Sequence, residues 1–329
     1  MSDDARVERV LDELIGDLAT SPARRAVTHE LVARFADLVR EDPDDDDLKV
    51  AASILDELLD AANVFSPWRD RRKLTVFGSA RTPASSPLYE MARELGRRMT
   101  ERGWITVSGA GPGIMEAAAR GAGLENTLGV NVDLPFEQSA NPFVDAETRL
   151  VETKYFFTRK VALTRESLAF AIFPGGLGTL DETFEILTLL HTGKSSPAPV
   201  VLVDVAGGTY WERWQAFVEE AIIADGYLDA PDVCLYRIVH DLEGVIAEID
   251  RFYSNFISFD LAGGRATVAL QRPPTPAQLA DLVEAVPAFA AGEGYRATDL
   301  GISFAFDGRQ YVSLRRVIDV ANGWVAAGA

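Results

Sequence analysis

The chain has 329 residues, 47% of them hydrophobic, and 32 basic against 50 acidic side chains give it a formal net charge of −18. This balance argues against nucleic acid as a partner, because phosphate contacts need clustered Lys and Arg, but it still allows a small anionic substrate. The single cysteine, Cys234, excludes an internal disulfide and fits a reducing compartment. No apolar run approaches the roughly 20 residues of a membrane helix, and the acidic N-terminus lacks a signal-peptide core. We therefore expect a cytoplasmic protein without membrane contact.

Residues 1–72 are predicted to form a helical extension. The acidic run 41–47 is typical of a solvated turn that leads into a helix N-terminus, where negative charge is favourable. Apolar side chains recur at helical spacing in three stretches: Val7, Val10, Leu11, Leu14 and Leu18; Leu31, Phe35, Leu38 and Val39; Leu48, Ala52, Leu55, Leu58 and Leu59.

Residues 73–254 alternate between strand and helix patterns. Strands are expected at 74–77, 104–107, about 128–133, about 147–151, 168–173, 199–203 and 234–239. Helices are expected at 88–102, from 114, at about 155–166, and at 180–192, 210–224 and 242–252. Repeated strand–helix units predict an α/β fold: a doubly wound, Rossmann-like parallel sheet covered by helices on both faces, with ligands at the carboxyl ends of its strands.

Residues 255–329 are predicted to form a small α+β unit. Segments 256–260 and 266–270 alternate around Ala262-Gly263-Gly264, which indicates a hairpin. A helix is expected at 277–286, and strands near 300–306 and 310–314 should precede a final helix. The pattern of this unit points to no particular chemistry.

The most informative motif is the run Pro174–Glu182, which joins the predicted strand at 168–173 to the predicted helix at 180–192. A strand, a tight glycine turn and a helix start form an anion site, because free N–H groups and the positive helix end converge there. Glycines also let the backbone approach a phosphate closely. The alternative interpretation is structural, with Thr179 as N-cap and Glu182 at N3 of a capping box. The two roles are compatible.

A second glycine cluster, Gly109–Gly113, also lies between a strand and a helix. It resembles the dinucleotide fingerprint, and Asp133 follows at the distance of a ribose-binding acid. The third glycine is missing, because Ile114 stands there, and the cluster follows the second strand of the block rather than the first. These departures favour a phosphate or sugar contact over a dinucleotide site.

Three other signals are less specific. Arg159 and Lys160 begin a helix either as a solvated basic pair or as cations that face a ligand, and the aromatic residues before them favour partial burial. Segment 191–195 resembles the end of a Walker A loop but lacks the earlier glycine. No metal-binding spacing relates the three histidines, His29, His191 and His240.

Together these motifs resemble the LONELY GUY (LOG) family of nucleoside 5′-monophosphate phosphoribohydrolases, often labelled lysine decarboxylases. The family's P-G-G-x-G-T-x-x-E motif corresponds to Pro174–Glu182, and its R-K pair corresponds to Arg159 and Lys160. Its glycine-rich segment corresponds to 109–115, and its first strand likewise ends in Gly78-Ser79. The resemblance implies a Rossmann-like LOG domain.

The resemblance covers about residues 73–254 and has departures. Ala110 replaces a family glycine, and Glu116 stands where plant-type members often have glycine. Segment 134–142 looks like the longer bacterial branch of the family. The base that is released and the task of the two terminal extensions stay open.

The resemblance implies hydrolysis of the N-glycosidic bond of AMP or a cytokinin-type nucleotide to a free base and ribose 5-phosphate, without a metal or organic cofactor. Glu182 would stabilise positive charge on the ribose or orient the attacking water, and Arg159 would orient Glu182 or assist the leaving base. The phosphate and ribose would be held by Ser79, Gly111, Gly113, Lys160, Gly175, Gly176, Gly178 and Thr179.

Other functions use the same residues differently. A non-catalytic nucleotide or cofactor carrier of the same fold would need only the glycine loops. A pyridoxal-phosphate decarboxylase would need a Schiff-base lysine, for which Lys160 is the one candidate within these motifs. A dinucleotide-dependent oxidoreductase is the least favoured. Because the family forms dimers or larger assemblies, a homo-oligomer is expected.

Overall fold

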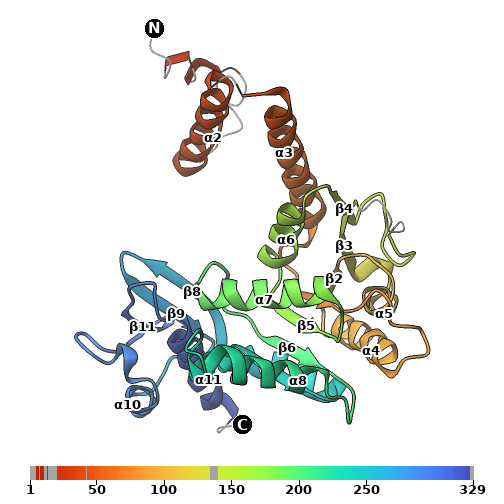
Figure 1. The fold of residues 1–329 in the computed structure, drawn as a ribbon. Coiled ribbons are helices and arrows are strands. Elements are labelled where there is room, and N and C mark those ends of the chain that lie inside the picture. The colour runs from red at the N-terminus through yellow and green to blue at the C-terminus, as the bar shows by residue number, and fades with distance from the viewer. Residues whose placement is uncertain are drawn as a thin grey trace. The chain divides into compact units, whose positions relative to one another are not determined.

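A computed structural model describes residues 5, 6, 8–10, 13, 21–41, 43–133 and 140–326. Contacts within the chain define two compact units, Met1–Leu58 and Leu59–Ala329 (Figure 1). The three-part division predicted from the sequence, with boundaries at 72/73 and 254/255, stays a prediction.

The first unit is helical in its described part. It holds α2 (Pro22–Arg40) and most of α3 (Asp45–Phe65), whose end belongs to the second unit. The carboxylate of Asp44 accepts hydrogen bonds from the amides of Asp46 and Asp47 at 3.0 and 2.9 Å, so this part of the acidic run is a turn into a helix, as predicted. In the first predicted stretch Val10 is helical, while Val7, Leu11, Leu14 and Leu18 lie outside the described residues.

The second unit is built on a seven-stranded sheet in the order β4-β3-β2-β1-β5-β6-β7. Every strand pair in this sheet is parallel, which confirms the predicted doubly wound α/β class. The strands are β1 (Lys73–Phe77), β2 (Ile105–Ser108), β3 (Thr127–Val132), β4 (Leu150–Thr153), β5 (Ala169–Ile172), β6 (Val200–Val203) and β7 (Tyr236–Val239).

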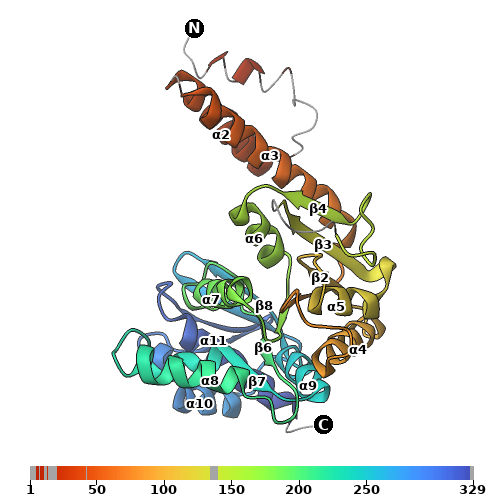
Figure 2. The same cartoon turned by 45° about the vertical axis from the view of Figure 1, so that its right-hand side comes forward.

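Helices cover both faces of this sheet. Leu74 and Val76 of β1 pack with α4 (Pro87–Glu101), α5 (Ile114–Ala122) and α9 (Leu242–Phe252). Phe77, on the opposite face, packs with α6 (Phe156–Arg165), α7 (Leu177–His191), α8 (Tyr210–Phe217) and the end of α3. Helices α4 and α5 lie side by side in both views (Figures 1 and 2). Gly96 allows this approach, because a Cβ there would lie 2.1 Å from the carbonyl oxygen of Ala118.

Two predicted helices differ from the observed ones. Helix α7 begins at Leu177 rather than at 180, because Gly178 adopts helical backbone and the turn ends at Gly176. The helix predicted at 210–224 is α-helical only to Phe217 and continues as a π-helix, Val218–Ile223. Short 3₁₀ turns connect other elements at Ser66–Trp68, Leu124–Asn126, Ala230–Leu235 and Pro287–Phe289.

The C-terminal part adds an antiparallel sheet in the order β10-β11-β9-β8. The predicted hairpin is confirmed. The strand predicted at 310–314 is wrong, because those residues begin α11, whose buried Leu314, Val317 and Ile318 follow helical spacing. The elements are β8 (Phe256–Ala262), β9 (Arg265–Leu270), α10 (Pro276–Ala285), β10 (Arg296–Thr298), β11 (Gly301–Ala305) and α11 (Tyr311–Ala326).

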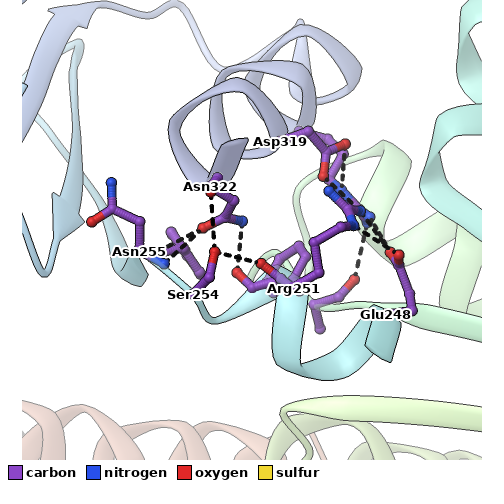
Figure 3. A network of polar contacts seen from close by, with 10 residues as sticks. Glu248, Arg251, Ser254, Asn255, Asp319 and Asn322 are labelled. Carbon is purple, nitrogen blue, oxygen red and sulfur yellow. Dashed lines mark hydrogen bonds and ion pairs between the residues drawn. The ribbon is translucent and has the colours of Figure 1, made fainter. Parts of the chain in front are cut away.

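A buried polar network joins α9 and the start of β8 to α11 (Figure 3). The side-chain oxygen of Asn322 accepts hydrogen bonds from the amides of Asn255 and Phe256 at 3.1 and 2.8 Å. Nearby, the Arg251 guanidinium pairs with Glu248 and Asp319. These contacts fix the C-terminal part to α9, a helix that packs on the parallel sheet.

No helix in the described part of the chain combines the length and apolar character that crossing a bilayer requires. Nor do the described residues contain a group of three or more His, Cys, Asp or Glu side chains arranged to hold a metal ion.

Candidate functional site

An open pocket of about 600 Å³ lies where β1 and β5 end. Its lining comes from the loop after β1, from Phe156 and Arg159 of α6, and from the start of α7. This is the edge at which open parallel sheets bind ligands. The lining residues are Phe77, Gly78, Ser79, Ala80, Arg81, Met115, Val132, Phe156, Arg159, Gly176, Leu177, Gly178, Thr179, Asp181 and Glu182.

The first turn of α7 supplies backbone amides to this pocket. The helix opens with a hydrogen bond from the Leu180 amide to the Gly176 carbonyl at 3.1 Å. The amides of Leu177, Gly178 and Thr179 therefore have no partner within the helix, and the positive end of the helix dipole lies beside them. The geometry of such a helix start suits an anion such as a phosphate.

Gly175 keeps this turn close to the loop after β1. The Ser79 amide donates to the Pro174 carbonyl at 3.1 Å, which joins the two loops. A Cβ at Gly175 would lie 2.1 Å from the Thr179 hydroxyl and 3.0 Å from the Ser79 amide. The absence of a side chain at Gly175 therefore allows the start of α7 and the loop after β1, which both line the pocket, to lie in contact.

The capping box predicted for Thr179 and Glu182 is wrong. Because α7 begins at Leu177, Thr179 lies inside the first turn and the N-cap is Gly176, which makes no side-chain cap. Glu182 lies beyond the N3 position and cannot reach back to the N-cap amide. Its carboxylate is instead directed to α6.

Glu182 forms a buried ion pair with Arg159. The Arg159 Nη1 donates to Glu182 Oε1 at 2.9 Å, and Arg159 Nε donates to the Val130 carbonyl at 3.2 Å. Glu182 Oε2 is buried and makes no hydrogen bond among the described residues. The carboxylate thus keeps one oxygen uncommitted beside the pocket.

Burial raises the pKa of the Glu182 carboxyl group, and the charges of Arg159 and Lys160 act in the opposite direction. A carboxylate that lies in a pocket with a perturbed pKa is a candidate for general acid–base or electrostatic catalysis.

Gly109 makes room for the Arg159 guanidinium. A Cβ at position 109 would lie 2.3 Å from Arg159 Nη2. Sequence reasoning placed Gly109 in the glycine cluster but assigned it no role, since its neighbour here is 50 positions away in the chain. The close approach depends on the pairing of strands and could not be read from spacing.

Gly113 and Gly111 do not line the pocket, but they lie in the loop that precedes α5 and packs beside it. The Ile114 amide donates to the Ser79 carbonyl at 3.1 Å. Gly113 has φ +67°, and a Cβ there would lie 2.4 Å from that same carbonyl. Asn141, which sequence reasoning missed, donates from Nδ2 to the carbonyls of Ala110 and Gly111, each at 3.0 Å.

Lys160 lies among carboxylates of α7. Its Nζ is 2.9 Å from Asp181 Oδ2 and 2.8 Å from Glu185 Oε2. Of the predicted site residues, the structure brings Ser79, Arg159, Gly176, Gly178, Thr179 and Glu182 into the pocket lining. Gly111, Gly113, Lys160 and Gly175 lie outside that lining.

Two charged lining residues were not predicted although the sequence held a signal for each. Arg81 follows Gly78-Ser79 by two positions and adds a cation to the pocket. Asp181 precedes Glu182 in the motif and adds a second carboxylate. The fold and the site together define a Rossmann-like α/β protein in which a helix start with unpaired amides lies beside a buried carboxylate.

Several known proteins are similar to this chain. Residues 113–249 match a family model described as "Possible lysine decarboxylase". The chain is 33% identical over 132 residues to a Mycobacterium tuberculosis protein named cytokinin riboside 5′-monophosphate phosphoribohydrolase, covering 39% of this chain and 68% of that protein. It is 33% identical over 170 residues to a probable enzyme of the same name from rice, covering 50% and 65%.

Among solved structures, the molybdenum cofactor carrier protein of Chlamydomonas reinhardtii is similar, with 24% identity, a TM-score of 0.39 and coverage of 55% of this chain and 97% of that one. The chain belongs to the LONELY GUY (LOG) family, whose curated members named above are phosphoribohydrolases.

Proposed function

We propose that the protein hydrolyses the N-glycosidic bond of a nucleoside 5′-monophosphate, AMP or a cytokinin-type nucleotide, and releases a free base and ribose 5-phosphate. One observation carries the proposal: the Glu182 carboxylate lines the same pocket as the free amides at the start of α7. The names of the relatives support the same reaction class.

In this proposal the phosphate binds at the α7 amides with help from Ser79 and Arg81. Remote binding of the phosphate fixes the ribose and places its anomeric carbon near Glu182. As the bond to the base breaks, the ribose gains positive charge, which a carboxylate stabilises. Water adds its oxygen to the anomeric carbon as the bond to the base breaks. One of its protons goes to the departing base, and the other stays on the new hydroxyl group of ribose 5-phosphate.

Arg159 has a positioning role in this scheme. Its bond to Glu182 Oε1 holds the carboxylate, and a small rotation of that group would turn the buried, unbonded Oε2 toward the ribose or the water. Lys160 would act indirectly, by holding the carboxylates of Asp181 and Glu185 in place. A lysine engaged by two carboxylates is a poor Schiff-base nucleophile, because ion pairing keeps it protonated.

Incubation with AMP, GMP, CMP and isopentenyl-AMP, followed by chromatography, tests the proposal. Glu182→Ala should lower base release at least about a hundredfold while nucleotide binding survives. Glu94→Ala is a control, because Glu94 also pairs with an arginine but lies on α4 and does not line the pocket. Absence of ribose 5-phosphate with every nucleotide contradicts the enzyme proposal, and tight binding without turnover supports a carrier.

We also propose that the protein is a cytoplasmic homo-oligomer. Leu177 and Phe156 line the pocket yet are 88% and 50% exposed, and the neighbouring Phe157 is also exposed. A second copy placed over this apolar rim would bury it. Light scattering should give at least twice the monomer mass of 35.8 kDa. A monomeric mass at all concentrations contradicts the proposal.

A further inference from the structure

Three consecutive carbonyl groups of the turn before α7 each accept a hydrogen bond. Backbone amides donate to the carbonyls of Pro174 and Gly176, each at 3.1 Å. The carbonyl between them, that of Gly175, accepts from the Tyr210 hydroxyl at 2.8 Å. Tyr210 is the first residue of α8 and lies 35 positions away in the chain. A side chain from another helix thus holds the middle of the turn.

The hydrogen bond to Gly175 sets the direction of the next amide. The bond between Gly175 and Gly176 is a trans peptide, in which the carbonyl and the following N–H point in opposite directions. Because the carbonyl is directed to Tyr210, the Gly176 N–H points away from α8. Gly176 lines the pocket at the ends of β1 and β5, whereas no residue of α8 does. The structure pairs this amide with no acceptor among the described residues.

Tyr210 is itself fixed by the buried end of β6. The Asp204 carboxylate, directly after this strand, is buried and accepts from the Tyr210 amide at 3.0 Å and from the Val205 amide at 2.8 Å. A Cβ at Gly208 would lie 2.2 Å from the same carboxylate, so the turn closes tightly around it. The start of α8 therefore has a fixed place relative to the sheet.

The Tyr210 ring packs against a buried tryptophan. It meets the Trp211 ring edge to face, with ring centroids 4.8 Å apart at 85°. Trp211 is fully buried, and its Nε1 donates to the Val203 carbonyl of β6 at 3.1 Å. Burial raises the pKa of the Tyr210 hydroxyl, so this group stays protonated and can donate at neutral pH. The hydroxyl is therefore a donor in a fixed place.

We propose that Tyr210 is a positioning residue for the phosphate of the nucleotide. Its hydroxyl holds the Gly175 carbonyl, so that the Gly176 amide is oriented toward the pocket before the phosphate arrives. Preorganised amides bind an anion more tightly, because the turn does not have to be ordered on binding. This inference rests on the proposed function, since it takes the amides at the start of α7 to hold a phosphate.

Tyr210→Phe removes the hydroxyl and keeps the ring. Ribose 5-phosphate is the probe for binding, because it carries no base and is not consumed during a titration. Its dissociation constant, measured by calorimetry, should rise about three- to tenfold, which is the effect of losing one neutral hydrogen bond. Tyr210 does not line the pocket, so the effect has to pass through the turn.

Steady-state kinetics with the preferred nucleotide of the panel gives a second measurement. In Tyr210→Phe a bound phosphate orders the turn itself, so KM should rise about three- to tenfold while kcat stays within about twofold of the parent. General damage to the pocket would instead lower kcat, because Glu182 and Arg159 belong to the same lining.

Tyr295→Phe is the matched control. The Tyr295 hydroxyl also donates to a backbone carbonyl, that of Val286 at 2.7 Å, but Tyr295 lies in the C-terminal part and does not line the pocket. Both variants should unfold at a lower temperature than the parent, because each loses one hydrogen bond of this kind. Only Tyr210→Phe should weaken the binding of ribose 5-phosphate.

The outcomes separate this proposal from the proposed hydrolysis. Unchanged binding and KM in Tyr210→Phe would overturn the role of Tyr210 and leave the hydrolysis intact. Weaker binding of ribose 5-phosphate in Tyr210→Phe, without base release from any nucleotide, would support that role and contradict the hydrolysis. Equal weakening in Tyr295→Phe would overturn the role, since lower stability alone would explain it. A parent chain that binds no ribose 5-phosphate would overturn it as well.

Discussion

At the scale of single residues, burial and pairing act on Glu182 in opposite directions. Burial raises its pKa, and Arg159 and Lys160 oppose the rise. If the ionised carboxylate stabilises the ribose cation, protonation removes activity, so kcat/KM should fall as the pH drops. The acid limb should lie above the ordinary glutamate pKa of about 4.3.

Substitution of Arg159 should change how far the pKa of Glu182 is raised. Arg159→Met removes the nearer cation and should move the acid limb to higher pH. Arg165→Met, measured in the same pH–rate series, removes another cation of α6 that does not act on Glu182, so it should leave the position of the limb close to that of the parent. A limb that moves to lower pH in Arg159→Met contradicts this assignment.

A second prediction concerns the close contact between Gly109 and the Arg159 guanidinium. Gly109→Ala would put a methyl group 2.3 Å from Arg159 Nη2 and displace the guanidinium. Misplacement of about 1 Å in an active site can cost about a hundredfold in rate, and we expect a loss of kcat of that order. Gly323→Ala, where a Cβ meets nothing within 4 Å, should leave kcat unchanged. Full activity in Gly109→Ala would show that Arg159 needs no fixed position.

Much of the candidate site is predictable from the sequence, because its motifs are local. The run Pro174–Glu182 carries its glycines, its helix start and its carboxylate within nine positions of the sequence. The partners of these residues are not local. Arg159 meets Gly109, and Asn141 holds Ala110, only because strands distant in sequence pair in the sheet.

At the scale of elements, Gly113 sets the distance between the start of α5 and the loop after β1. Gly113→Ala combines a backbone of φ +67° with a Cβ 2.4 Å from the Ser79 carbonyl. We predict a loss of about 2–4 kcal/mol in the free energy of unfolding, the sum of strain and displaced backbone. Urea unfolding measures it.

Gly103→Ala is the matched control for this change. Gly103 also has a positive φ, +83°, but a Cβ there meets nothing within 4 Å. It should cost only the strain of about 1 kcal/mol. Equal losses in the two variants would show that the contact with Ser79 carries no energy.

The elements that the sequence misassigns share a physical cause. At α7 the Thr179–Glu182 pattern fits a cap, but glycines in an exposed first turn tolerate helical backbone, so the helix starts earlier. At 310–314 a short apolar alternation fits a strand, and only the longer spacing through Ile318 and Ala321 shows the buried helical face. Stretches of only a few residues cannot distinguish a helix cap from a helix interior, or a strand from a helix.

At the scale of the whole second unit, one hydrophobic cluster runs from Leu74 of the parallel sheet to Phe304 of the antiparallel sheet. We therefore predict a single unfolding transition for Leu59–Ala329, with tryptophan fluorescence and circular dichroism changing together. Two separate transitions would contradict this, and would support independent folding of the C-terminal part.

Substitution of Asn322 also tests whether the two sheets share one core. Asn322→Ala leaves the buried amides of Asn255 and Phe256 without an acceptor and the Phe252 carbonyl without a donor (Figure 3). The expected cost is about 2–4 kcal/mol. The midpoints reported by both probes should fall by the same amount, because the two sheets share one core.

Helix α7 carries both the amides of its first turn and the carboxylate of Glu182, which lies in its second turn. Because a helix rises by about 1.5 Å per residue, the distance between the proposed phosphate site and the carboxylate is set by regular structure and not by a loop. A nucleoside that lacks the 5′-phosphate should therefore lose correct placement of its anomeric carbon as well as affinity, and kcat should fall together with binding.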